Sequence, residues 1–250
     1  MPLLPETFAK LVTLHEDRWD RLAPTIREAR SMYLCRLVRD AQEDQVADGP
    51  TIETSRAAEF VEGYLASLFA RAPSVEVARG LSGRGNVETA RAVINEFLAA
   101  PAIAEAINDA ATQALLFPGA FVKVIPHEDG GASAVAISPW DIILDDVASR
   151  WEDQRWIAHR RFIPRDDADA FGVDVESYPS SRYGDRADEA IADPHVAIWE
   201  VHDLIEGEVH FWSATNRDAW SKSVATPFAG GLVPSPFVPF FFGTEPGNLL

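Results

Sequence analysis

The stretch Ala111–Asp146, ATQALLFPGAFVKVIPHEDGGASAVAISPWDIILDD, decides the fold. Its first residues continue a helical pattern, which Pro118-Gly119 ends. Two apolar runs follow, Ala120–Ile125 and Ala134–Ile137, on either side of a polar turn at His127–Gly131. Two β-rich runs around a Gly-Gly turn predict a hairpin. A helical first half therefore passes here into a β-rich second half.

Before this stretch, apolar residues recurring at three- and four-residue steps predict helices. The predicted helices are Phe8–Leu37, Thr51–Ala70, Val87–Leu98 and Ala102–Leu116. Pro24 lies inside the first and is expected to break or restart it, because proline removes a helical hydrogen bond. Their expected apolar faces include Phe60, Val61, Tyr64, Leu65 and Leu68 in the second helix, and Val93, Ile94, Phe97 and Leu98 in the third.

After Trp151 the pattern becomes β. Alternation at 156–162 predicts a strand, and His195–Leu204 and Val209–Trp212 predict a second hairpin around Glu206-Gly207. The polar stretch Tyr178–Pro194 is expected to be a loop. The Pro- and Phe-rich stretch Thr226–Phe242 is expected to be an extended segment over apolar surface, because proline does not fit a central strand.

These elements predict an α+β fold, with a helical N-terminal half packed on a β-hairpin-rich second half. The two halves are not expected to be independent domains, because the apolar helix faces need the β half to bury against. Composition is ordinary for a globular chain of 250 residues, with 47% hydrophobic and 24% charged residues.

Charge and cysteine content exclude several classes of protein. The net charge of -17 argues against a tight, sequence-reading nucleic-acid binder, although DNA can still slide past such a surface. The single cysteine, Cys35, allows no intrachain disulfide and no cysteine metal cluster. No apolar run reaches the length of a membrane span, and the first residues do not read as a signal peptide.

Histidines and aspartates offer two candidate metal sites. The six histidines are His15, His127, His159, His195, His202 and His210. The first candidate pairs His202 and His210 across the Glu206-Gly207 turn, and a zinc site there would need a third ligand such as Asp203, without any HExxH motif to support it. The alternative is that they are half-exposed strand residues. Asp141, Asp145 and Asp146 form the second candidate, and turn capping is the alternative for them.

Catalytic motifs are not found in the sequence. It has no G-x-S-x-G, no P-loop and no G-x-G-x-x-G after a strand, and Gly83-Arg84-Gly85 reads as a flexible turn. Cys35 has Arg36 and Arg39 nearby but is expected to be a buried structural cysteine. His159-Arg160-Arg161 alternates sides of a strand and is expected to pair with surrounding acids. No catalytic, cofactor-binding or metal residue is therefore assigned, and the protein is not expected to be an enzyme.

Four passages carry a resemblance to a known family. In order they are ALLFPGAFVKVIP at 114–126, AISPWDIILDD at 136–146, WIAHRRFIPRDDADAFG at 156–172, and VAIWEVHDL at 196–204 followed by PSPFVPFFF at 234–242. Their order resembles the N-terminal wing portion of tailed-bacteriophage portal proteins. That family shows an aliphatic-Lys-aliphatic strand, a proline before a short acidic stretch, a strand before a short helix, and a Trp-Glu strand before a Pro-Phe segment.

The resemblance implies a division into a helical segment and linker at 1–50 and a portal wing-like α+β region at 51–250, without the family's stem, clip and crown. It implies a ring, usually of twelve subunits, at the capsid vertex of the virion. Double-stranded DNA passes through this ring, and the partners are the major capsid protein, terminase and head-tail adaptor proteins. No cofactor is implied. Two alternatives remain, a metal-dependent α+β hydrolase using His202, Asp203 and His210, and another virion neck or capsid structural protein.

Overall fold

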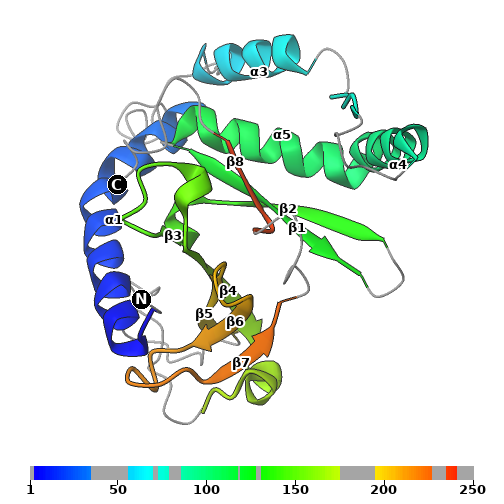
Figure 1. Cartoon of the computed structure of the whole chain (residues 1–250). Coiled ribbons are helices and arrows are strands. Elements are labelled where there is room, and N and C mark those ends of the chain that lie inside the picture. Colours follow the sequence, from blue (N-terminus) through cyan, green and yellow to red (C-terminus); the bar gives the residue numbers. More distant parts are fainter. Residues whose placement is uncertain are drawn as a thin grey trace, which may run out of the picture.

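The structure is a computed structural model, and it describes residues 3–34, 56–69, 73–78, 86–117, 119–127, 131–174, 195–226 and 235–240. Several sequence predictions lie outside these residues. They concern Cys35, the Gly83-Arg84-Gly85 turn and the loop Tyr178–Pro194. Within the described ranges the fold is α+β, as predicted, with helices before residue 117 and antiparallel sheets after it (Figure 1).

The described helices match the predicted ones to within a few residues. They are α1 Pro5–Tyr33, α3 Arg56–Leu68, α4 Val87–Ala99 and α5 Pro101–Leu116. The expected break at Pro24 is wrong, because α1 continues through it. Proline fixes φ near a helical value and removes only one helical hydrogen bond. Burial of Phe8 and Val12 before Pro24 and packing of Tyr33 after it anchor the two ends of α1.

The predicted first hairpin is confirmed and belongs to a three-stranded antiparallel sheet. Its strands are β1 Ala120–Pro126, β2 Ala132–Ile137 and β8 Phe237–Phe240, in the order β2-β1-β8. β1 is the central strand, with Phe121 opposite Ile137 on one side and Pro239 on the other. The Pro- and Phe-rich β8 is an edge strand, in agreement with the expectation that it is not central.

The remaining strands form a five-stranded antiparallel sheet. In their order across the sheet they are β3 Ile142–Leu144, β4 Trp156–Pro164, β5 His195–Asp203, β6 Glu208–Trp212 and β7 Lys222–Ala225. Short 3-10 helices precede and follow strands of this sheet, at η1 Pro139–Asp141, η2 Trp151–Asp153 and η3 Arg165–Phe171. Gly172 ends η3 with φ of 70°, and a Cβ there would lie 2.5 Å from the carbonyl oxygen of Ser221. Only glycine fits both conditions.

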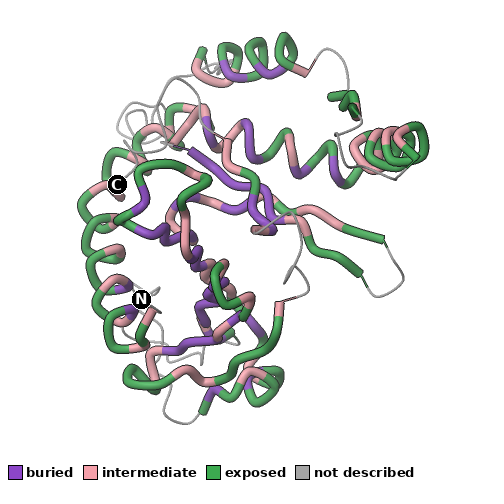
Figure 2. Tube along the Cα trace, in the orientation of Figure 1, coloured by how far each residue is buried: buried purple, intermediate pink, exposed green. Residues whose placement is uncertain are grey.

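Both faces of the five-stranded sheet are covered. On one face, α1 packs Phe8 and Val12 against Ile143, Trp156, Ala158, Trp199, Val201 and Trp212. On the other face, Ile142, Leu144 and Ile157 meet Phe121, Ile137 and Phe237 of the three-stranded sheet. The buried residues in Figure 2 accordingly follow the strands between these layers. The five-stranded sheet therefore lies between α1 and the three-stranded sheet.

The outer face of the three-stranded sheet is covered by α5. Ala110 and Ala114 of α5 pack on Ala120 and Val122 of β1, and small residues allow this close approach of helix and sheet. Helices α3 and α4 lie outside α5 (Figure 1). α3 buries only Val61 and Leu65, and α4 buries no residue. The predicted apolar faces are therefore only partly covered, since Phe60 and Val93 are exposed.

We expect Phe8→Ala to lower the free energy of unfolding by roughly 3–5 kcal/mol, as for other buried aromatic residues. Phe8 is fully buried and lies edge-on to Trp156, Trp199 and Trp212, with ring centroids 5.6–6.2 Å away. The control is Leu14→Ala on the same helix, which is 65% exposed and is expected to change the value by less than about 0.5 kcal/mol. Equal effects in chemical denaturation would contradict the docking of α1.

Candidate functional site

Ionisable side chains are concentrated between the two sheets. Glu200 and His202 are two residues apart on β5, so they project from the same face of the sheet. This face is turned toward the three-stranded sheet, from which β1 contributes Lys123. Arg161 comes from β4, the neighbour of β5. Three strands therefore bring four polar side chains to one place in an otherwise apolar interface.

Glu200 is the centre of this group. Its Oε1 accepts hydrogen bonds from Lys123 Nζ at 2.6 Å and from His202 Nε2 at 2.7 Å, and its Oε2 accepts one from Arg161 at 3.1 Å. The side chains of Lys123 and Glu200 are each 8% exposed, and that of Arg161 is 41% exposed. We name these four residues the Glu200 cluster. Both carboxylate oxygens are occupied, so no acceptor of Glu200 is left without a partner.

The cluster keeps Glu200 ionised. Burial alone would raise the pKa of Glu200, because a charge is poorly solvated in the interior. The hydrogen bond from His202 and the charge of Lys123 outweigh burial and hold the pKa of Glu200 below its ordinary range. Burial lowers the pKa of Lys123 and of His202, and the Glu200 carboxylate opposes both shifts. A neutral His202 that donates through Nε2 is consistent with this arrangement.

His159 and Phe237 border the cluster. The Phe237 ring lies 5.4 Å from Lys123 Nζ and edge-on to both His159 and His202. Burial, together with the charge of Lys123, lowers the pKa of His159 to about 3. The Nδ1 atom of His159 is buried and has no hydrogen-bond partner among the residues that the structure describes. An imidazole in this position is therefore neutral and contributes shape and packing to the edge of the cluster.

The arrangement suits a structural role better than a catalytic one. Shifted pKa values in a group of charges are typical of active sites, but structural ion pairs produce them too. Here the shifted groups are buried, and the carboxylate is fully used by its own neighbours. What the cluster does physically is connect β1 of one sheet to β4 and β5 of the other. It therefore holds the two sheets in one relative position.

The structure does not bring the residues of the first candidate metal site, His202 and His210, opposite each other. β5 and β6 pair His202 with Val209, and His210 with Val201. Directly paired residues share a face and successive residues alternate, so His202 and His210 project from opposite faces of the sheet. Asp203 caps the turn instead, since its Oδ1 accepts the N–H groups of Ile205 and Glu206. The three proposed ligands therefore do not converge.

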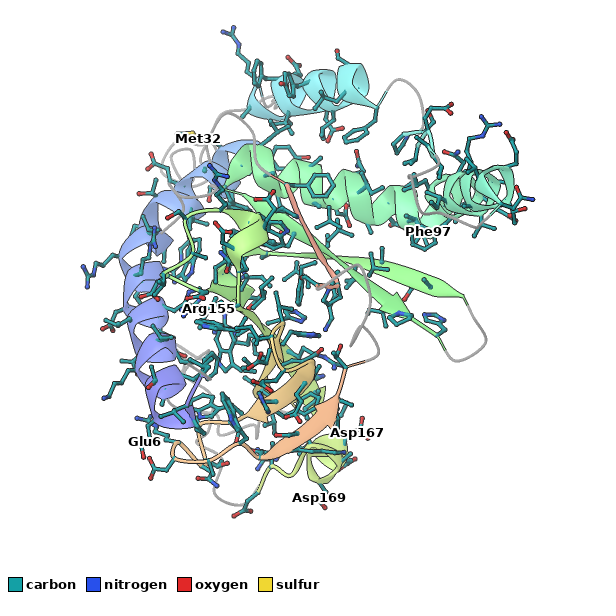
Figure 3. The ribbon with its side chains drawn as sticks, in the orientation of Figure 1. Glu6, Met32, Phe97, Arg155, Asp167 and Asp169 are labelled. Atoms are coloured by element: carbon teal, nitrogen blue, oxygen red, sulfur yellow. The ribbon has the colours of Figure 1, made fainter. Side chains whose placement is uncertain are left out.

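The three aspartates of the second candidate do not converge either. Asp141 pairs with Arg160 at 2.8 Å, and burial raises its pKa despite that arginine. Asp145 is buried and accepts a hydrogen bond of 2.9 Å from Arg155. Arg155 is labelled in Figure 3. Burial would raise the pKa of Asp145, but the bonds from Arg155 and the Val147 N–H outweigh it and lower the pKa. Asp146 is exposed, so each aspartate has a different environment.

Across the described ranges, no group of three or more His, Cys, Asp or Glu side chains is arranged to hold a metal ion. Within the same ranges, no helix combines the length and the apolar character that crossing a membrane requires. The basic run His159-Arg160-Arg161 divides between the faces of β4, as predicted. Arg160 pairs with Asp141, and Arg161 pairs with Glu200. These pairs leave no single basic patch on this strand.

A second ionisable group, the half-buried His15, joins α1 to the segment that leads into the five-stranded sheet. Its Nε2 donates to the carbonyl oxygen of Trp140 at 2.8 Å, and its ring lies edge-on to Trp19 and Trp199. Burial, with smaller contributions from the charges of Arg160 and Arg18, lowers the pKa of His15 to about 4. Sequence reasoning missed this contact because its two partners are 125 residues apart and neither forms a motif.

Sequence reasoning also missed the Glu200 cluster, although one signal was available. Lys123 is the only charged residue in the apolar run Ala120–Ile125. A lysine is rarely buried without a partner, so a charged residue within such a strand indicates a buried carboxylate elsewhere. The same logic applies to Glu200 in the run Val196–Val201. Sequence alone does not show that the two belong together.

We expect Glu200→Gln to lower the free energy of unfolding by roughly 3–5 kcal/mol, because it leaves Lys123 and part of Arg161 buried without a counter-charge. The matched control is Glu88→Gln, which breaks an exposed pair with Arg91 and should change the value by less than about 1 kcal/mol. Chemical denaturation at neutral pH measures both. If the two substitutions have equal effects, the cluster does not hold the sheets together.

We expect His15 to make the protein less stable in mild acid. Its pKa of about 4 in the folded chain lies below the ordinary 6.5, so the unfolded chain binds this proton first as the pH falls. Stability is therefore complete above pH 6.5 and decreases toward pH 4, by on the order of 2–3 kcal/mol for this group.

The test is the free energy of unfolding of His15→Gln between pH 7 and 4, since glutamine retains an N–H donor for Trp140 but does not titrate. The wild-type decrease should shrink by that amount, while His159 contributes equally to both proteins. The control is His127→Gln, which removes an exposed histidine outside the interior. Superimposable profiles for His15→Gln and the wild type would contradict the role of His15.

Comparison with known proteins does not assign the chain to a family. No protein-family model matches the sequence, and no curated protein matches it significantly. Its function therefore has to be inferred from its contacts, its charge and the resemblance in the order of its segments.

Proposed function

We propose that this chain is a structural subunit of a tailed-bacteriophage portal, the ring at the capsid vertex. The observation that carries the proposal is the contact between Lys123 and Glu200, whose charged atoms lie 2.6 Å apart. Lys123 is the lysine of the portal-like aliphatic-Lys-aliphatic strand, and Glu200 is the glutamate of the portal-like Trp-Glu strand. Two passages 77 residues apart are therefore joined through the residues that make each resemble the family.

The other portal-like passages belong to the same unit. AISPWDIILDD contributes the last two residues of β2 and forms η1 and β3. WIAHRRF forms most of β4, which supplies Arg161 to the Glu200 cluster. The Pro-Phe segment forms β8, whose Phe237 lies beside Lys123 and His202. Each portal-like passage is a weak motif alone. Contacts between residues of several passages support the resemblance more strongly than the order of the passages does.

Surface properties support assembly as the mode of action. Large apolar side chains are exposed at places far from one another, as expected for a subunit with several neighbours. They include Phe60, Tyr64 and Leu68 on α3, and Ile125 and Val135 on the first hairpin. The net charge of -17 repels DNA phosphates, which favours a ring that DNA passes without adhering. The proposed action is therefore assembly and conduction of double-stranded DNA, without catalysis.

The partners follow from this role. They are other copies of the chain in a ring, the major capsid protein, the terminase that drives DNA in, and the head-tail adaptor proteins that bind later. The proposed place of action is the virion. The metal-dependent hydrolase has no comparable support, because the register of β5 and β6 separates His202 from His210.

The proposal predicts a closed ring of about a dozen subunits, and a ring must use two different faces of each subunit. Native mass spectrometry and particle imaging of the longest natural form of the gene product test this. A monomer or dimer from that form would overturn the proposal. Metal analysis of the same sample tests the hydrolase, which requires a stoichiometric ion that is lost in His202→Ala.

A further inference from the structure

The edges of the two sheets differ in how they are protected from pairing with another chain. Sheet edges expose unpaired backbone donors and acceptors, and proteins commonly protect them with proline, charge or short length. β8 contains Pro239, and β3 has only three residues. β2 has six residues, Ala132–Ile137, with neither proline nor charge. Among the described edges, β2 is therefore the longest and the least protected.

The hydrogen bonds of the hairpin show which residues of β2 face outward. His127 N–H donates across the hairpin to Gly131, and Val124 N–H donates to Pro236 on the other side of β1. The direction of the backbone N–H and C=O groups alternates along a strand, so those of the odd-numbered residues of β2 point toward β1. Its even-numbered residues, Ala132, Ala134 and Ala136, therefore direct their N–H and C=O groups to the open edge.

Side chains near this edge are also uncovered. Ile125 and Val135, on the face of the hairpin opposite α5, are 40% and 42% exposed. Figure 1 shows the hairpin extending beyond the five-stranded sheet toward its turn. A strand added along β2 would satisfy the outward backbone groups and shield part of this apolar surface.

The charge distribution favours a second copy of this chain as the occupant. Two copies with a net charge of -17 repel each other over most of their surfaces. Residues 131–140 include no charged side chain, so here two copies can approach without placing like charges together. A partner recognised through basic residues would instead need acids along β2, and β2 has none.

The second copy offers one other suitable edge in the described chain, β7. Its residues Lys222–Ala225 are all exposed and lack proline. Lys222 is bent back to donate to the carbonyl oxygen of Ala170, so its charge is directed away from the edge. Thr226 N–H donates to Gly207 across the sheet, and alternation then directs the backbone of Ser223 and Ala225 outward.

We propose that β2 of one copy pairs with β7 of the next, joining the three-stranded sheet of one subunit to the five-stranded sheet of its neighbour. β2 and β7 are different surfaces, so the contact is head-to-tail and each subunit uses one edge of each kind. The inference rests on the proposed ring function, for which it supplies the contact between subunits.

Cysteine cross-linking in the longest natural form tests the pairing. Cys35→Ser is present in every variant, and one protein carries Ala132→Cys while the other carries Ser223→Cys. Opposed residues on paired strands lie roughly 5 Å apart and diagonal ones about 7–8 Å apart. Bis-maleimides of increasing length are used, so that they span the registers that the four residues of β7 can take along the six residues of β2. The mixed sample should give a cross-linked dimer that neither protein gives alone. The control replaces Ser223→Cys by Asp17→Cys, exposed on α1, and should give none.

Particle imaging of the same samples separates the two proposals. A ring with the mixed cross-link supports the pairing. A ring without it, or a cross-link of Ala132→Cys with itself, overturns the pairing and leaves the portal proposal standing. A cross-link in open chains keeps the pairing and overturns the ring. The absence of both the ring and the cross-link would overturn both proposals.

A second variant tests the edge without cross-linking. Ala132→Lys places a charge at an exposed position of the open edge, where lysine deters strand pairing. In this test one protein carries Ala132→Lys together with Ala134→Cys, and the other carries Ser223→Cys. The cross-link between the two proteins is expected to be lost. Unchanged circular dichroism and thermal unfolding would show that the subunit itself is intact. Undiminished cross-linking would overturn the pairing.

Discussion

The ion contact between Lys123 and Glu200 determines how the two sheets lie against each other. A buried carboxylate with a single cation gains little, because both ions lose their hydration. Glu200 instead receives Lys123, His202 and Arg161 together, so each of its oxygens is satisfied. A one-residue slip of β1 or β5 would turn one partner to the opposite, apolar face. The contact therefore selects one register, whereas apolar packing between sheets tolerates several.

The opposite face of the five-stranded sheet depends on a different kind of contact. There α1 buries Phe8 among tryptophans, and His15 donates to the backbone of Trp140. The tryptophan rings pack around Phe8, and the hydrogen bond of His15 ties the helix to the backbone of Trp140. Because both faces are covered, α1 and the β half share one core, and the helix does not form a separate unit.

Local patterns predict much of this fold, and contacts between distant residues explain what they miss. The helices and the first hairpin follow from periodicity and from Gly and Pro. The second hairpin shows the limit, since a three-residue turn centred on Glu206 would place His202 opposite His210, whereas the four-residue turn Leu204–Gly207 pairs His202 with Val209. A turn that is longer by one residue shifts the pairing register by one, which moves every side chain of the strand to the other face of the sheet. Periodicity likewise reveals the apolar residues of α3 but not what covers them, and Phe60 is exposed.

The distribution of charge connects this architecture to assembly. Buried charged side chains pair with one another in the Glu200 cluster and in the pairs of Asp141 with Arg160 and Asp145 with Arg155, and buried Asp203 caps a turn. Interactions with other molecules are then left to the surface. That surface is strongly acidic except along strips such as residues 131–140. An acidic exterior discourages indiscriminate association and DNA adhesion, so the proposed contact between copies would use an uncharged strip. Selective contact through a few edges is the property that a closed ring requires.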